Sequence, residues 1–202
     1  ASMHPHSTIA ECLFGPKFTR AYYDIVYGRV NIKHESWEIM NTMLEGKLMP
    51  FIQKVINGEM TSGDLANALK TAINSVYGLT AANFENPFRD PRNIDNIVAK
   101  RGALFMIDLK YEVQKRGFTV AHIKTDSIKI PDATPEIIQF VMEYGKEYGY
   151  TFEHEATYDR MCLVNDAVYI AKYKDSEECQ RLYGYIPGDN KKKGGKWTAT
   201  GT

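Results

Sequence analysis

Apolar residues recur at helical spacing along much of this 202-residue chain. Residues three or four positions apart lie on one face of a helix, so this spacing predicts amphipathic helices. We expect helices over residues 35–56, with Pro50 as a kink or break, and over residues 63–77, 90–116 and 134–149. The glycines expected to end them are Gly58, Gly78, Gly117 and Gly149.

Other stretches are rich in β-branched and aromatic residues, which favour strands. Residues 120–130 predict a β-hairpin with Thr125 and Asp126 in the turn, and residues 150–173 predict further strands. The periodicity of residues 21–32 does not decide between helix and strand. This order of elements predicts an α+β fold, in which an antiparallel sheet is backed by helices.

Composition limits the class of protein. The chain is 44% hydrophobic with a formal net charge of zero, which indicates a globular protein with a sizeable core. No apolar run approaches the roughly 20 residues that cross a bilayer, and the first residues lack a secretory pattern. We therefore expect a cytoplasmic protein with no membrane partner. The cysteines form no CxxC pair, which argues against a disulfide framework and a thiolate metal site.

Zero net charge argues against a surface that binds nucleic acid everywhere, although it allows a local basic patch. The densest positive run is residues 191–196, whose glycines favour a mobile loop. Such a run is either solvated or in contact with phosphate.

Candidate chemistry lies on one helix and one turn. Lys70, Asn74 and Tyr77 share a face of the helix predicted over residues 63–77. That face is either an ordinary solvated surface or one that presents an ammonium, a carboxamide and an aromatic ring to a ligand. Asp126 is either a turn former or a ligand of a hard divalent cation such as magnesium.

Three separated segments resemble, in the right order, motifs of the family B DNA polymerases of the compact kind found in bacteriophages. Residues 70–78, KTAINSVYG, fit the K-x-x-x-N-S-x-Y-G motif of the fingers at every fixed position. Residues 122–127, HIKTDS, are similar to the Y-x-D-T-D-S motif of the palm. Residues 2–5, SMHP, resemble the S-L-Y-P segment that follows the first catalytic aspartate of the family.

The resemblance implies template-directed DNA synthesis by nucleotidyl transfer from a dNTP to a primer 3′ hydroxyl, with two Mg²⁺ ions in the complete enzyme. It implies Asp126 as the catalytic metal ligand. The nucleotide-binding residues that it implies are Lys70, Asn74, Ser2, Met3 and His4. The residues that it implies for template and primer binding are Tyr77, Gly78, Arg101, Thr125, Ser127 and Tyr169.

Some positions depart from the family pattern. Lys124 stands where the palm motif commonly has its first aspartate, and His4 replaces the tyrosine that excludes a ribose 2′ hydroxyl. Asp166 or Ala167 occupies the lysine position of the K-x-Y primer-strand motif, of which Tyr169 remains. The first catalytic aspartate of the family is expected two residues before Ala1, so we expect a fragment that is inactive alone.

The resemblance divides the chain into a palm remnant over residues 1–34, fingers over 35–82, palm over 83–175 and a palm-to-thumb connection over 176–202. Expected partners are primer-template DNA, dNTP and the exonuclease, N-terminal palm and thumb portions of the parent polymerase, in the host cytoplasm if a phage encodes it. The alternative is a non-catalytic nucleic-acid-binding module or scaffold that needs a partner chain.

Overall fold

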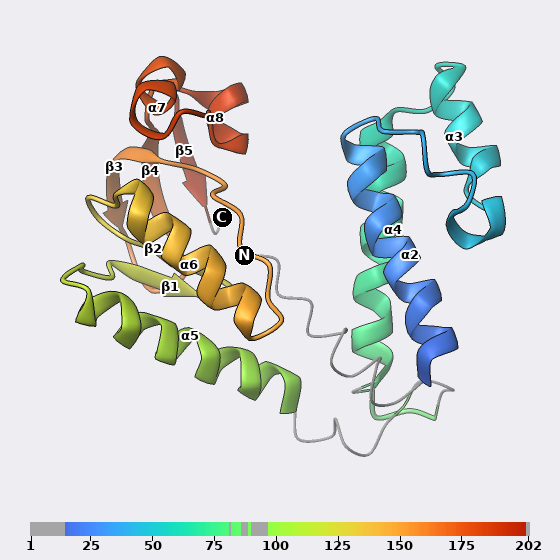
Figure 1. Ribbon diagram of the computed structural model, residues 1–202, viewed down its shortest axis with the longest axis horizontal. Coiled ribbons are helices and arrows are strands. Elements are labelled where there is room, and N and C mark those ends of the chain that lie inside the picture. Colours follow the sequence, from blue (N-terminus) through green and yellow to red (C-terminus); the bar gives the residue numbers. More distant parts are fainter. Residues whose placement is uncertain (1–14, 81, 86–88, 90–96, 201–202) are drawn as a thin grey trace. The chain divides into compact units, whose positions relative to one another are not determined.

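The computed structural model of the protein describes residues 15–80, 82–85, 89 and 97–200. The chain forms two compact units that divide between Lys100 and Arg101 (Figure 1). We call the part before this boundary the helical unit and the part after it the α+β unit, and we describe α5, whose first residues precede the boundary, with the α+β unit. The described part of residues 1–34 lies in the helical unit. The division into palm, fingers and thumb connection stays a prediction.

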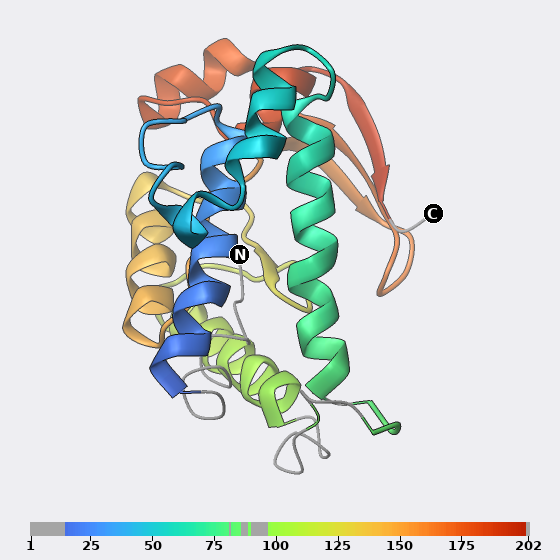
Figure 2. The same ribbon diagram turned by 90° about the vertical axis from the view of Figure 1, so that its right-hand side faces the viewer.

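The helical unit is organised around two long helices. Its elements are α2 (Gly15–Lys33), the 3₁₀ helix η1 (Met43–Gly46), α3 (Met49–Ile56) and α4 (Ser62–Thr80). Helices α2 and α4 lie side by side in both views (Figures 1 and 2), and Arg29 Nε donates to the Ala66 carbonyl at 3.2 Å. Residues 21–32, whose periodicity was ambiguous, are helical. The buried core of the unit consists of Ile32, Met40, Leu48, Ile52, Leu65 and Ala66.

The continuous helix predicted over residues 35–56 is wrong. Residues 34–42 lie in turns and irregular backbone, and the α-helix begins only at Met49. Pro50 lies in the first turn of α3, where its fixed φ and missing N–H are tolerated. The proline therefore starts a helix here and does not kink one. Gly58, with φ of 76°, follows the end of α3 as predicted.

The helix predicted over residues 63–77 is confirmed. Thr61 caps it, because Thr61 Oγ1 accepts from Asp64 N at 3.0 Å while Asp64 Oδ2 accepts from Thr61 N at 3.3 Å. The helix continues to Thr80, so Gly78 lies inside it and does not end it.

The α+β unit confirms the predicted fold class, although its strands form two small antiparallel sheets and not one. Its elements are α5 (Ile97–Lys115), β1 (His122–Lys124), β2 (Ser127–Lys129), α6 (Pro135–Glu147), β3 (Tyr158–Leu163), β4 (Tyr169–Tyr173), α7 (Ser176–Tyr183), α8 (Gly188–Lys193) and β5 (Trp197–Thr200). The core lies between α5 and α6 and contains Phe105, Met106, Leu109, Val113, Ile137, Val141, Tyr150 and Phe152.

The ends of these helices follow the sequence signals. Thr134 Oγ1 accepts from Ile137 N at 3.4 Å and caps α6, while Gly117 and Gly149 have positive φ after α5 and α6. The predicted start of the long helix near residue 90 lies outside the described residues.

Residues after Tyr173 are more ordered than predicted. The lysine-rich run expected as a mobile loop forms helix α8 up to Lys193, and residues 197–200 add β5 to the β3–β4 sheet. Helices α7 and α8 lie next to each other at one end of this sheet (Figure 1). Among the described residues, no helix is long and apolar enough to cross a membrane.

Candidate functional site

The β1–β2 hairpin places Asp126 at its tip. Lys124 pairs with Ser127 across the hairpin, which leaves Thr125 and Asp126 as the turn. Thr125 has a φ of 49°, a left-handed conformation that is unfavourable for a β-branched residue. Asp126 is half-buried beside it. Residues with strained backbone are often found at functional sites. The tip of the hairpin is therefore a candidate site independently of the sequence motif of residues 122–127.

The two faces of this hairpin have different environments, because side chains alternate along a strand. Ile123 and Ile128 pair with each other and pack on the core between α5 and α6. His122 and Lys129 pair on the opposite face, next to Tyr169 of β4. The apolar face anchors the hairpin, and the polar face is available for chemistry.

Lys124 and His122 connect the hairpin to the β3–β4 turn. Lys124 Nζ donates to the Ala167 carbonyl at 3.0 Å, and His122 Nε2 lies 3.0 Å from the Asp166 carbonyl. A carbonyl only accepts, so Nε2 must carry the proton in this contact. His122 Nδ1 is buried with no hydrogen-bond partner. Lys124 and His122 therefore have structural roles in this fold.

Tyr169 lies at the centre of a group of polar side chains. It is 7% exposed, its hydroxyl lies 3.3 Å from the Tyr158 hydroxyl, and Lys129 Nζ lies 4.9 Å from its ring centroid. Burial would raise the pKa of Tyr169, but hydrogen bonds with Thr200 and Tyr158 and the Lys129 ammonium outweigh burial and lower it. Burial and the bond to Tyr169 raise the pKa of Tyr158. The structure thus brings Tyr169 beside the polar face of the hairpin.

The predicted nucleotide-binding face lies on α4 in the helical unit. Lys70 and Asn74 are exposed and four residues apart, so they project from one side of the helix. Ile73, between them, is 9% exposed and points the other way. Tyr77 belongs to the same helix. Apart from its chain neighbours and the backbone of its own helix, Gly78 has no described atom within 4 Å of the position that a Cβ would take.

The remaining predicted residues are more dispersed. Ser2, Met3 and His4 lie outside the described residues. Arg101 donates to the Tyr148 carbonyl at 3.3 Å and stacks 5.6 Å from the centroid of the Tyr150 ring, so it joins α5 to the end of α6. Ser127 Oγ donates to the Lys124 carbonyl at 3.2 Å and braces the turn.

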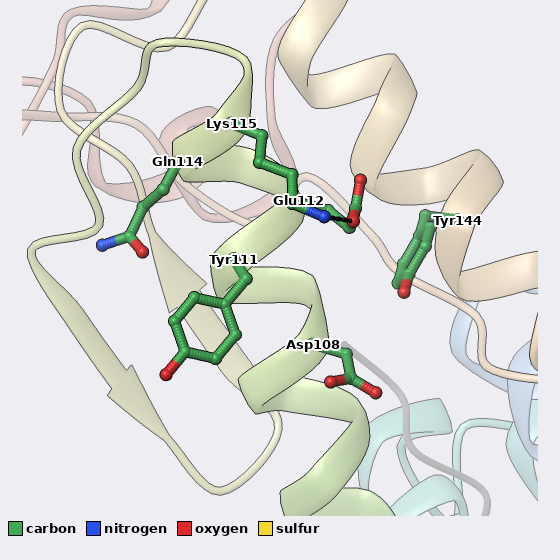
Figure 3. Close-up of a pocket in the computed structure, with 6 residues that line it drawn as sticks. All are labelled: Asp108, Tyr111, Glu112, Gln114, Lys115 and Tyr144. Carbon is green, nitrogen blue, oxygen red and sulfur yellow. Dashed lines mark hydrogen bonds and ion pairs between the residues drawn. The ribbon is translucent and has the colours of Figure 1, made fainter.

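A shallow hollow of about 470 Å³ lies between α5 and α6, away from every predicted site residue. Figure 3 shows Glu112 held by Lys115 on α5, with Tyr144 of α6 across the opening. Hydrogen bonds from Lys115 and Arg116 lower the pKa of Glu112, and burial raises the pKa of Tyr144 to about 12. The Glu112 carboxylate is already paired with Lys115 and Arg116 of its own helix.

Asp126 meets only part of what a magnesium site requires. No group of three or more acidic, histidine or cysteine side chains gathers within the portion of the chain that the structure describes. Magnesium, however, is often held by only one or two carboxylates together with water and substrate phosphates. Asp126 can supply one such carboxylate.

Sequence reasoning missed the neighbours of Tyr169, namely His122, Lys129 and Tyr158. Alternation along residues 122–130 contained a signal for the first two, since both fall opposite the apolar face of the hairpin. Comparisons of the chain with protein-family models, with curated proteins and with solved structures found no match. Its function is therefore inferred from its own residues.

Proposed function

We propose that this chain is the fingers and palm portion of a template-directed DNA polymerase of family B. The observation that carries the proposal is the K-x-x-x-N-S-x-Y-G pattern on α4, with both Lys70 and Asn74 exposed on the helix. Its other support is the strained turn that holds Asp126 at the tip of a rigid hairpin.

In the proposed reaction the primer 3′ oxygen bonds to the α-phosphorus of a dNTP. The bond from that phosphorus to the bridging oxygen of pyrophosphate breaks, and the hydroxyl proton passes to solvent. Magnesium, when bound, supplies positive charge to the reacting oxygens. Lys70 compensates charge on the triphosphate, and Asp126 contributes a metal-binding carboxylate. Asn74 and Tyr77 contact the new base pair, and Gly78 allows the template close approach.

Primer extension tests the role of Asp126. The proteins are this chain and a longer form that extends it at the N-terminus, each with Mg²⁺, dNTPs and a labelled primer-template. We expect extension by the longer form, its loss in Asp126→Asn, and its retention in Asp132→Asn, an exposed aspartate in the turn before α6. Extension by the Asp126→Asn variant at the unchanged rate would reject the assignment.

Nucleotide binding tests the role of Lys70. Titration of dTTP with Mg²⁺ should give weaker binding for Lys70→Ala and unchanged binding for Lys54→Ala, an exposed lysine on α3. Equal affinities in the two variants would remove Lys70 from the site.

A second candidate function is a non-catalytic nucleic-acid-binding module that works with a partner chain. The exposed Lys191 and Lys192 on α8 favour it. Primer-template binding without extension by either protein would support this function and contradict the first.

A further inference from the structure

The three-stranded sheet of the α+β unit carries a row of cationic and aromatic side chains. Arg160 of β3 pairs with Lys172 of β4, and Lys172 pairs with Trp197 of β5. Directly paired residues project from the same face of a sheet, with neighbouring strands about 4.8 Å apart. The side chains therefore follow one another across the sheet as arginine, lysine and tryptophan.

The face that carries this row is open, whereas the opposite face is buried. On β4 the alternate residues Tyr169, Ala171 and Tyr173 are at most 7% exposed, but Ile170 is 42% exposed. Trp197 is 60% exposed. The row beside Arg160–Lys172–Trp197 consists of the paired residues Cys162, Ile170 and Ala199, all of them exposed. The open face thus combines an apolar platform with two cations.

The charges on this face are not neutralised by the described residues. The ion pairs nearby involve Lys174, the residue after β4, whose Nζ lies 3.8 Å from Asp159 Oδ1 and 3.5 Å from Glu178 Oε2. Neither Arg160 nor Lys172 forms an ion pair with any described residue, and none of the ring contacts there involves Trp197. An exposed indole in the same row as two unpaired cations suits a ligand that has both flat rings and negative charges.

We propose that this face binds single-stranded nucleic acid. Trp197 stacks on a base, Arg160 and Lys172 bind the adjoining phosphates, and Ile170 supports the neighbouring sugar or base. Aromatic stacking with a cationic track binds single strands with little sequence preference, because every base has a face to stack. A duplex hides those faces, and an apolar protein partner would leave the two cations uncompensated. The inference does not rest on the proposed polymerase activity.

The test uses the chain's two tryptophans. Trp37→Phe leaves Trp197 as the only indole, so its fluorescence reports the face directly. Titration with dT₁₂ and rU₁₂ at low salt should quench this fluorescence, while duplex DNA, an abasic oligonucleotide of equal charge and heparin should quench it much less. Quenching by both dT₁₂ and rU₁₂ would show that the face binds single-stranded nucleic acid of either kind. Tighter binding of one of them would show whether the face prefers DNA or RNA.

Variants separate stacking from charge. Measured by anisotropy of labelled dT₁₂, Trp197→Ala should weaken binding about 10-fold, and Trp197→Phe should retain most of it. Arg160→Ala and Lys172→Ala should each weaken binding and reduce the slope of log K against log salt by about one. Arg181→Ala, an exposed arginine on α7, should leave binding unchanged.

Equal quenching by heparin and dT₁₂, or equal affinities in Arg160→Ala and Arg181→Ala, would overturn the inference. Preferential binding of duplex DNA or of an acidic protein would also overturn it. Asp126→Asn should leave dT₁₂ binding unchanged while it abolishes extension by the longer form, so failure of the polymerase proposal is distinguishable from failure of this one.

Discussion

Asn190 and Thr157 are joined by a reciprocal pair of hydrogen bonds between side chain and main chain. Asn190 Oδ1 accepts from Thr157 N at 2.9 Å, and Asn190 Nδ2 donates to the Thr157 carbonyl at 3.0 Å. The same Nδ2 also donates to the Lys174 carbonyl at 2.7 Å. Asn190 is completely buried, so this one amide fastens α8 to the ends of β3 and β4.

Asn190→Ala should destabilise the α+β unit by about 3 kcal/mol, because the Thr157 amide and the Lys174 carbonyl lose the partner that the Asn190 side chain provides, while the Thr157 carbonyl keeps its bond from Lys174 N. The measurement is urea unfolding followed by Trp197 fluorescence in the Trp37→Phe background. Asn57→Ala, at an exposed position after α3, is the matched control and should shift the midpoint little. A loss below about 0.5 kcal/mol for Asn190→Ala would contradict the role of the buried amide.

Gly145→Ala should also destabilise the α+β unit, by about 1–3 kcal/mol, because the interior of a core does not accept added volume. A Cβ on Gly145 would overlap the Phe152 ring and lie 3.3 Å from the Tyr150 carbonyl. Phe152→Leu in the same chain should recover part of the loss if the clash is the cause. Equal stability of Gly145→Ala and the parent protein would show that the ring moves aside freely.

The sequence predicted correctly those helix boundaries that depend on residues close to them in the chain. Thr134 followed by proline, and Gly117 and Gly149 at the helix ends, mark boundaries that the structure confirms. Pro50 illustrates the limit, since the same residue type starts a helix or breaks one depending on the residues before it. Strand β5 was not predicted, because its four residues gain their order from pairing with β4, a partner distant in sequence.

The candidate site was predictable only in part for the same reason. The turn residues Thr125 and Asp126 follow from the pattern of residues 120–130. The bonds from Lys124 and His122 to the β3–β4 turn join residues more than 40 positions apart, and no local pattern specifies them. The cationic row across the sheet likewise depends on strand register.

Stability of the α+β unit should fall as pH falls below about 6.5. Burial lowers the pKa of His154 below its ordinary value of 6.5, and its ring accepts or donates bonds of 2.8 Å with Tyr185 and Thr157. Below pH 6.5 the unfolded chain binds the proton more readily than the folded one, so stability is lost as pH falls towards the folded pKa. Urea midpoints of the single-tryptophan variant across this range measure the effect.

His154→Gln should flatten this pH dependence, because the titrating group is removed. His34→Gln, at an exposed position in the helical unit, should leave the profile unchanged. A profile that stays equally steep in His154→Gln would assign the effect to other groups.

Substitution of Gly78 in α4 can distinguish a role in helix stability from a role in template binding. A glycine inside a helix costs about 0.5–1 kcal/mol relative to alanine, and apart from its chain neighbours and the backbone of its own helix no described atom lies within 4 Å of where a Cβ on Gly78 would be. Gly78→Ala should therefore raise the thermal stability of the helical unit, followed by circular dichroism. If the template approaches the helix at this point, the same variant should bind labelled primer-template several-fold more weakly.

Gly63→Ala, in the first turn of α4, is the control for this binding test. It asks whether any methyl group added to the helix weakens binding, because a Cβ on Gly63 also has room, at 3.7 Å from Thr61 Oγ1. Equal binding by the two alanine variants would remove Gly78 from the template contact, whereas a loss confined to Gly78→Ala would show that the glycine serves the ligand and not the helix.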